Sequence, residues 1–551
     1  MRIRVIGGGL AGPEAALTAA RLGCQVDLYE MRTIVDGKPR LTPAHQTTAF
    51  GELVCSNSLK SESPNTAPWL LKQEMRRAGS VLLRIADQTA VPAGHALAVD
   101  RVEFSRRIGE AIAAEPKIRV FREEVTHLDP PNPQDPEAAQ LTILATGPLT
   151  SEALSREIER ITGSGHLAFY DSISPIVDAE TIDMDRVYFA ARWDKGTADY
   201  INCPMDREEY DRFLDALLAA EAAEAREWEK LEYFEGCLPI EILARRGRDT
   251  LRFGPMKPVG LRDPRTGKTP WAVVQLRKEN LRADSYNLVG FQNHLKFGEQ
   301  ARVLRLIPGL ETARFLRYGQ IHRNTYICAP LLLDETLRLQ PHSIESTKCQ
   351  GATSQAAEKL DPEGGGGFNP RIRPTGSMRA GRGGFQPTHL SPEGRFSPIS
   401  HEISSFSAAS SVVPQTLRND GRALAREERS AAMDHTILFA GQLSGVEGYT
   451  ESIATGLLAG LYAASLARGQ EPTPVPRATA LGSLVHYVTH ADPKSFQPAN
   501  ITFDLLEPLE EELRRKVRDK KERHRLQCER SLAAFDAWWS AMPHPAAELR
   551  G

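Results

Sequence analysis

Cysteine is scarce in this sequence, and it has neither long apolar runs nor an excess of charge of one sign. The 551 residues include only seven cysteines, and no two are spaced as Cys-x-x-Cys. This scarcity argues against a disulfide framework and a zinc site and favours a reducing compartment, so we expect a cytoplasmic protein without a bound metal. The 68 Lys and Arg against 71 Asp and Glu exclude a uniformly basic surface for nucleic acid, but not a local basic patch.

No segment is long and apolar enough to span a bilayer. The most apolar stretch of the C-terminal half, Leu457 to Ala467, is short and contains Gly460. The first residues run directly into a glycine cluster and lack the pattern of a signal peptide. We therefore expect no membrane association. The chain is too long for one hydrophobic core, so two or more domains are expected.

The N-terminal residues have the pattern of a nucleotide-binding unit. A short apolar strand at 2–6 leads into Gly7-Gly8-Gly9-Leu10-Ala11-Gly12, a helix is predicted over 13–23, and a strand over 25–30 ends in Glu30. The glycines let the backbone approach a pyrophosphate at the helix N-terminus, and the carboxylate accepts hydrogen bonds from a ribose. Glu30 leaves no obvious place for a 2′-phosphate, which favours FAD or NAD over NADP.

The other segments predict an α/β chain with a discontinuous Rossmann-type domain. Buried strands are expected at 141–147 and 437–441, and a helix of small residues from about Glu451 to Ala467. Strand-like runs around one charged helix at 206–230 predict an inserted α+β domain. The expected divisions are 1–165, 301–340 and 436–500 for the nucleotide-binding domain, 166–300 for the inserted domain, 341–435 for a low-complexity, disordered insertion, and 501–551 for a helical basic tail.

A second glycine-rich turn, Gly441 to Tyr449, follows the late strand. A flavin occupies the whole length of a Rossmann-type domain, so a distant second turn can meet its ribityl and ring end, which suggests FAD. Considered alone, the segment is equally compatible with a plain strand, turn and helix. Tyr449 could stack on the isoalloxazine or be a core tyrosine, and the residues leave both open.

Five segments resemble a single enzyme family. The sequence is similar to the bacterial folate- and FAD-dependent tRNA (uracil-5-)-methyltransferases over about 1–340 and 436–500, and it departs from them at 341–435, where the family has a short turn. The resemblance implies formation of 5-methyluridine in the T-loop of tRNA, with FAD as cofactor, methylenetetrahydrofolate as one-carbon donor and NADH or NADPH as reductant. The resembling segments are Ile6–Ala16, Glu52–Lys60, Phe234–Glu241, His322–Tyr326 and Phe439–Tyr449.

The resemblance also assigns roles to two cysteines. Uracil C5 is a poor nucleophile until a thiolate adds at C6. By resemblance, Cys237 is that nucleophile, and Cys55 lies close to the flavin and assists methylene handling or proton removal. The remaining cysteines are interpreted as buried small hydrophobic residues; they are Cys24, Cys203, Cys328, Cys349 and Cys528.

Two basic stretches are candidates for contact with tRNA phosphates. The cluster from Arg245 to Arg248, with Arg252 and Lys257, is preferred because it follows Cys237 closely. The run at 514–525 has acidic neighbours and is better explained as a solvated helix face.

Two other functions remain open. One is flavin-dependent modification of wobble uridine, for which the tail is expected to be too short, and the other is a non-catalytic FAD- or RNA-binding protein.

Overall fold

The computed structural model describes residues 2–128, 139, 141–163, 167–194, 197–222, 238–340 and 436–542, with the backbone alone at 167–172 and 321–323. Cys237, Cys349 and the segment 341–435 lie outside these residues. In the described part of the chain, no helix is long and apolar enough to cross a membrane.

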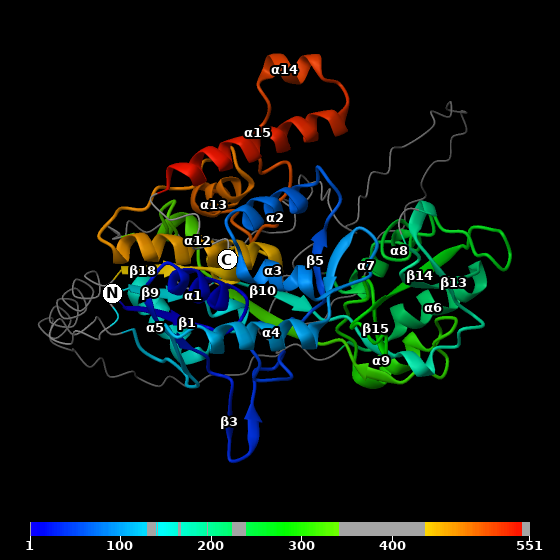
Figure 1. Cartoon of the computed structure of the whole chain (residues 1–551). Coiled ribbons are helices and arrows are strands. Elements are labelled where there is room, and N and C mark those ends of the chain that lie inside the picture. Colours follow the sequence, from blue (N-terminus) through cyan, green and yellow to red (C-terminus); the bar gives the residue numbers. More distant parts are fainter. Residues whose placement is uncertain are drawn as a thin grey trace, which may run out of the picture. The chain divides into compact units, whose positions relative to one another are not determined.

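A five-stranded parallel sheet forms the centre of the nucleotide-binding part (Figure 1). The strand order is β18-β9-β1-β2-β8, so strands from both ends of the chain lie side by side. The order reverses at β1, and in open α/β sheets ligands bind outside the carboxyl ends of the strands at such a switch point. The strands are β1 (Arg2–Ile6), β2 (Gln25–Tyr29), β8 (Ile118–Phe121), β9 (Leu141–Leu144) and β18 (Thr436–Phe439).

Helices α1 (Ala11–Arg21) and α12 (Tyr449–Ala467) pack tightly against each other. A Cβ at Gly456 would come within 2.4 Å of the carbonyl oxygen of Ala11, and one at Gly460 within 2.7 Å of that of Ala15. Glycine is therefore required for this approach. The contacts advance in the same direction along both helices, so the helices run parallel and both N-termini point to the same edge of the sheet.

Other helices and two small sheets surround this core. The helices are α2 (Ala67–Arg77), α3 (Val81–Gln88), α4 (Arg101–Ala114), α5 (Glu152–Thr162), α10 (Ala329–Leu332) and α13 (Ala480–His490). The small sheets are β3 (Thr33–Val35) with β4 (Lys38–Arg40), and β5 (Ser58–Ser61) with β7 (Ala96–Val99) and β6 (Ala90–Val91).

A six-stranded antiparallel sheet carries a second hydrophobic core, in the order β12-β13-β14-β15-β11-β16. It extends from Ile176 to Arg317, past residue 300, and the division of the chain into domains stays a prediction. Its strands are β11 (Ile176–Asp178), β12 (Tyr188–Ala190), β13 (Tyr200–Met205), β14 (Ala272–Lys278), β15 (Ser285–Leu288) and β16 (Phe315–Arg317). The accompanying elements are α6 (Arg207–Ala219), α7 (Ile240–Arg245), α8 (Thr250–Phe253), α9 (Phe297–Leu304), and the antiparallel pair β10 (Leu167–Ser172) and β17 (Ile321–Tyr326).

The charged helix predicted over 206–230 is shorter than expected. It begins as predicted, because Asp206 forms a capping box with Glu209, but α6 ends at Ala219. The next residues pair elsewhere: the Lys296 N–H donates to the Glu221 carbonyl oxygen at 3.0 Å. This pairing with the chain before α9 competes with continuation of the helix.

In its described part, the helical tail predicted over 501–551 contains two helices, α14 (Glu511–Lys516) and α15 (Lys520–Ala541). Val517 leaves the helical conformation. The side chain of Asp519 then accepts a hydrogen bond from the Glu522 N–H and starts α15. An N-cap inside the predicted helix therefore divides it.

Candidate functional site

The glycine turn after β1 leaves open space beside the N-terminus of α1. A Cβ at Gly7 would lie 2.3 Å from the Ala145 carbonyl oxygen, and one at Gly12 would lie 1.8 Å from the Gly7 oxygen, so packing requires both glycines. At Gly9, a Cβ would meet nothing within 4 Å. The N-cap residue of α1, Leu10, provides no side-chain cap. The turn thus combines room for a ligand with helix N–H groups that suit an anion.

Glu30 closes the first βαβ unit and is held by Arg32. The carboxylate accepts hydrogen bonds from the Gly8 N–H at 2.8 Å and from Nε of Arg32 at 2.9 Å. Both side chains are buried, with 5% of Glu30 and 2% of Arg32 exposed. Burial by itself would raise the pKa of Glu30, but the hydrogen bonds and charge of Arg32 outweigh it and lower that pKa. The carboxylate is therefore ionised and oriented at the end of β2.

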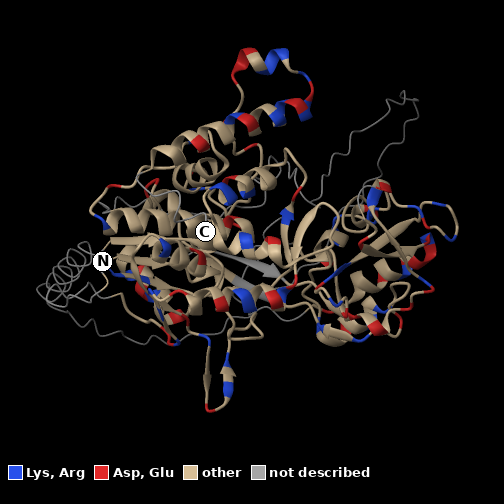
Figure 2. Ribbon diagram, in the orientation of Figure 1, with Lys and Arg blue, Asp and Glu red and all other residues tan. Residues whose placement is uncertain are grey.

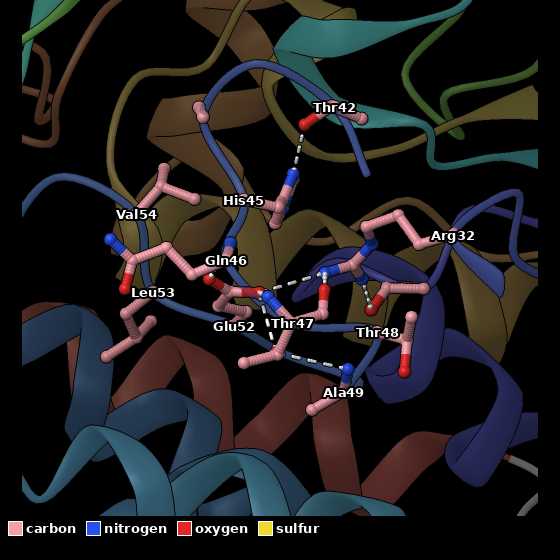
Figure 3. A network of polar contacts seen from close by, with 12 residues as sticks. Arg32, Thr42, His45, Gln46, Thr47, Thr48, Ala49, Glu52, Leu53 and Val54 are labelled. Atoms are coloured by element: carbon pink, nitrogen blue, oxygen red, sulfur yellow. Dashed lines mark hydrogen bonds and ion pairs between the residues drawn. The ribbon is translucent and has the colours of Figure 1, made fainter. Parts of the chain in front are cut away.

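A second carboxylate, Glu52, organises the loop that follows the β3–β4 hairpin (Figure 3). It accepts hydrogen bonds from the Gln46 N–H at 2.8 Å and from the N–H and hydroxyl of Thr47 at 3.0 and 2.8 Å. Arg32 also reaches Glu52, with 3.4 Å between Nη1 and Oε2. Glu30, Arg32 and Glu52 thus form a continuous polar network from the sheet edge into the loop.

The loop that carries Cys55 connects the two glycine turns. At one end the Gly51 N–H donates to the Gly8 carbonyl oxygen at 3.0 Å. At the other end the hydroxyl oxygen of Tyr449 accepts hydrogen bonds from the Cys55 N–H at 2.7 Å and from the Ser56 N–H at 3.2 Å. The structure therefore brings three predicted site residues, Gly8, Cys55 and Tyr449, to one edge of the parallel sheet.

The second glycine turn resembles the first in its local design. Gly441 has φ +72°, and its N–H donates to the Thr455 hydroxyl at 2.9 Å. Gly448 is the N-cap of α12 and supplies no side-chain cap. Tyr449, the first residue of α12, packs its ring partly against the core while its hydroxyl holds the Cys55 loop. Burial, with a smaller contribution from Cys55, raises the pKa of Tyr449 well above its ordinary value, so the phenol is neutral.

Two arginines surround the half-buried thiol of Cys55. Arg101 donates to the Leu53 carbonyl oxygen at 2.8 Å, and Arg317 donates to that of Val54 at 3.0 Å. Both guanidinium groups interact electrostatically with Cys55. Burial lowers the pKa of Arg317. The partly exposed thiol therefore lies beside two guanidinium groups, of which that of Arg101 is also paired with the buried Glu279; cationic neighbours are typical of reactive cysteines.

The other predicted cysteines divide into three groups. Cys24, Cys203 and Cys528 are buried, and burial raises the pKa of each thiol, which confirms the interpretation as hydrophobic core residues. Cys328 is also buried, but it is disulfide-bonded, which the sequence did not lead us to expect. Cys237 and Cys349 lie outside the described residues.

Glu241 is the nearest described acidic residue after Cys237 in the sequence, and it lies in the first turn of α7. Its side chain is buried; one oxygen accepts the His294 N–H at 2.9 Å, and the other has no hydrogen-bond partner among the described residues. Burial raises the pKa of Glu241 to about 7. A carboxyl group that changes protonation near neutrality is therefore the last residue of the segment that contains Cys237.

Comparison with known proteins identifies the family. A family model described as glucose inhibited division protein A matches residues 2–344 and 422–471. A protein of Koribacter versatilis named methylenetetrahydrofolate–tRNA-(uracil-5-)-methyltransferase is 56% identical over 538 residues, covering 98% of this chain and 98% of its own. A protein of the same name from Solibacter usitatus is 51% identical, covering 98% and 99%. The chain belongs to this methyltransferase family.

Solved structures support the fold assignment. GidA of Aquifex aeolicus, in its form II crystal, aligns with a TM-score of 0.57 at 15% identity, over 100% of this chain and 75% of the GidA chain. This likeness concerns the fold alone. Together with the parallel sheet and its antiparallel companion, it confirms the predicted α/β fold class. The match of the family model is interrupted at 345–421, and the predicted departure of 341–435 from the methyltransferase family stays a prediction.

Several residues at the site of this methyltransferase family member were missed by the sequence analysis. Arg101 and Arg317 lie in no recognisable motif, because their roles depend on contacts with distant backbone. Arg32 pairs with the side chain of Glu30, two residues before it, and was missed although it is close in the sequence. Asn57 and Lys60 do fall in the recognised segment 52–60. The Asn57 amide donates to the carbonyl oxygens of Val99 at 3.0 Å and Lys278 at 2.8 Å, and so joins the Cys55 loop to β14.

Lys60 holds the same segment to α12. Its ammonium group donates to Glu451 at 2.7 Å and to Asn500. The Thr450 hydroxyl adds a bond to the Leu59 carbonyl oxygen at 3.1 Å. The family segment 52–60 is thus anchored at both of its ends. Its recognition as a motif was the sequence signal from which Asn57 and Lys60 could have been found.

Two arginines of the basic cluster preferred for tRNA, Arg248 and Arg252, are engaged within the protein. Arg248 pairs with Asp211 at 2.9 Å and Asp215 at 2.6 Å. The guanidinium of Arg252 lies 3.4 Å from the centre of the Trp271 ring. These contacts limit what the two arginines can offer to phosphates, and which basic residues meet tRNA stays untested.

Several basic residues of the run at 514–525 pair with acidic neighbours on α14 and α15. Figure 2 shows acidic residues at the start of α14 and basic residues at its end, and residues of both signs along α15. On α14, Lys516 pairs with Glu512 at 2.5 Å, and on α15 Arg525 pairs with Glu522 at 2.6 Å. These pairs agree with the interpretation of a solvated helix face.

Proposed function

We propose that this protein methylates C5 of uridine in the T-loop of tRNA, with FAD as cofactor, methylenetetrahydrofolate as one-carbon donor and NADH or NADPH as reductant. The single observation that carries the proposal is the Cys55 loop, which is bonded to Gly8 of the first glycine turn and to Tyr449 of the second. Membership of the methyltransferase family supports it. The activity is that of a cytoplasmic enzyme.

FAD fits the residues of the two turns. The open space at Gly9 and the uncapped N–H groups of α1 suit a pyrophosphate, and the ionised Glu30 suits a ribose. In this proposal, Gly441 and Tyr449 of the second turn meet the ribityl chain and the ring. When bound, FAD supplies redox chemistry and carries the one-carbon unit. The remaining glycine-turn residues, Gly7, Gly8, Leu10, Ala11 and Gly12, shape the cradle.

The protein's own contribution to the chemistry is thiol catalysis. The Cys237 thiolate forms a bond to uracil C6, and the electron pair of the C5–C6 double bond moves to the C4 oxygen as an enolate. C5 then attacks the one-carbon unit, which enters as a methylene, a base removes the C5 proton, and the bond between the methylene and its carrier breaks with the electron pair leaving on the carrier. A hydride, ultimately from NADH or NADPH, adds to the methylene to complete the methyl group, and expulsion of the thiolate from C6 restores the C5–C6 double bond. Cys55, between Arg101 and Arg317, handles the methylene or the proton.

A methylation assay tests the proposal. The flavin-loaded protein is incubated with a tRNA transcript, methylenetetrahydrofolate and NADH or NADPH, and 5-methyluridine is quantified by mass spectrometry of the digested RNA. We expect the product only when the folate is present and the T-loop uridine is intact. A transcript with cytidine at that position is the control. Modification at the wobble uridine instead, or flavin binding without any RNA product, would overturn the assignment.

A further inference from the structure

Two histidines and a glutamate gather on the outer part of the molecule, away from the contacts of the Cys55 loop described above. His486 and His490 lie one turn apart on α13, with ring centroids 4.3 Å apart and an interplanar angle of 19°. Glu335 approaches them from the segment between α10 and residue 340, with its Oε1 3.7 Å from Nε2 of His490. One ligating atom from each of the three residues lies within 4.8 Å of the others.

A buried hydroxyl fixes the tautomer of His490. The Thr489 hydroxyl donates its hydrogen to the Val485 carbonyl oxygen at 2.9 Å, while its oxygen lies 2.8 Å from Nδ1 of His490. Because that hydrogen is already used, the oxygen accepts the Nδ1 hydrogen of the ring. The lone pair of a neutral His490 is then on Nε2, the atom that points to Glu335. Metal-bound histidines are commonly oriented in this way by a bond to the other ring nitrogen.

Arg477 interacts electrostatically with His486 from outside the cluster. Arg477 is itself held by the Ser483 hydroxyl at 2.6 Å and by the Leu505 carbonyl oxygen at 2.8 Å. Glu335 supplies a compensating negative charge, with about half of its side chain exposed. Two imidazoles and one carboxylate are a ligand set that suits Zn²⁺ and similar ions.

We propose that Glu335, His486 and His490 bind a divalent transition-metal ion, with Zn²⁺ as the representative case and water completing the coordination. The site would tie α13 to the segment that leads from α10 towards residue 340. It is independent of the flavin chemistry, because none of its residues contacts the glycine turns or the Cys55 loop in the described part of the chain. Because the ion would join these two segments without contacting the glycine turns or the Cys55 loop, we expect its role to be structural or regulatory.

The test measures Zn²⁺ binding to the flavin-loaded protein by equilibrium dialysis. We expect one ion per chain, and at least about tenfold weaker binding in His490→Gln and in Glu335→Gln. His127→Gln is the matched control, because His127 has the same contact with a preceding threonine, at 2.8 Å from Thr126, but belongs to no such cluster in the part of the chain that the structure describes. This variant should bind Zn²⁺ like the unmodified protein.

Two further measurements separate a metal site from a simple ion pair between His490 and Glu335. Thr489→Val should weaken Zn²⁺ binding about tenfold while the stoichiometry stays the same. Zn²⁺ should also raise the Tm of the unmodified protein, but not that of a variant carrying both His486→Gln and His490→Gln. Absence of saturable binding, or binding that persists unchanged in the double variant, would overturn the proposal.

Discussion

At the scale of single residues, the clearest functional sign is a glycine that packing does not require. Gly7 and Gly12 are needed because a Cβ at either would collide with backbone, whereas Gly9 faces open space. A protein that needed only a tight turn would tolerate a side chain at Gly9. The absence of a side chain at Gly9 leaves room for a ligand close to the backbone, as a pyrophosphate requires.

Gly9→Val should therefore abolish FAD binding without unfolding the protein, because the new side chain would occupy the space for the pyrophosphate. The measurement is the flavin absorbance of the purified variant and the FAD released on denaturation. Gly109→Val is the matched control, since a Cβ at Gly109 also meets nothing within 4 Å. Gly109 lies in α4 and not in the glycine turn, so this variant should keep its FAD. Retention of FAD by Gly9→Val would contradict the assignment of this turn.

The two cysteines should differ in a trapping experiment. With tRNA containing 5-fluorouridine, the C5 fluorine cannot leave as a proton does, so the enzyme should stall as a covalent protein–RNA adduct. Cys237→Ala should form no adduct and make no product but keep its flavin, whereas Cys55→Ala should make less product and still form some adduct. The adduct is measured by denaturing gel electrophoresis. An adduct that survives Cys237→Ala and disappears with Cys55→Ala would reverse the two roles.

At the scale of elements, buried carboxylates fasten helices to one another. Glu74 on α2 is fully buried and accepts hydrogen bonds from the Ala480 and Leu481 N–H groups at the start of α13, both at 2.8 Å. It also accepts the Ser531 hydroxyl of α15 at 2.7 Å. One side chain therefore joins three helices and caps the helix that carries His486 and His490.

Glu74→Gln should lower the free energy of unfolding by about 1–3 kcal/mol, because the amide NH₂ cannot accept the hydrogen bond that one carboxylate oxygen now accepts. Urea denaturation followed by circular dichroism measures the change. Glu110→Gln, at an exposed position of α4, is the control and should change stability by about 0.5 kcal/mol or less. Equal effects of the two substitutions would show that Glu74 does not fasten the helices.

The same residue should also make stability depend on pH. Burial raises the pKa of Glu74 from 4.5 to about 7. Between these values the folded state binds more protons than the unfolded state, so stability falls as pH rises from 4.5 to about 7 and stays lower above it. In Glu74→Gln this part of the slope should be missing, as measured by urea denaturation across that range. An unchanged slope would assign the pH dependence to other groups.

At the scale of the whole molecule, the segment 341–435 is flanked by chain ends that already lie side by side. The Leu339 N–H donates to the Ile437 carbonyl oxygen at 2.8 Å, and the Phe439 N–H donates to that of Leu337 at 2.9 Å. Antiparallel neighbours of this kind can be joined by a loop of a few residues. The parallel sheet therefore does not need the long connection in order to bring β18 into place.

A variant in which a short linker joins Leu339 to Thr436 should fold and retain FAD. Its Tm should not fall, because a shorter loop costs less closure entropy, by about 0.6 kcal/mol for each halving of its length. Flavin absorbance, thermal denaturation and the tRNA methylation assay make the comparison with the full chain. Loss of flavin would show that the segment is structural, and loss of methylation alone would give it a role with the substrate.

The sequence by itself determined the local units of this protein. The strand, glycine turn, helix and acidic residue from Arg2 to Glu30 are close in the chain, so their pattern predicts their structure directly. The segment 52–60 and the late glycine turn were recognised for the same reason, since each is a continuous motif. Helix ends were less certain, because the end of α6 depends on pairing with residues before α9.

Only the tertiary structure decided how these units combine. Cys55 and Tyr449 are 394 residues apart in the sequence, and they meet because glycines on α12 let it pack closely against α1. Arg101 and Arg317 reach Cys55 through backbone carbonyl groups, a contact that leaves no motif. Side-chain hydrogen bonds to distant backbone depend on the packing of whole helices and sheets, and for that reason no local pattern could have revealed them.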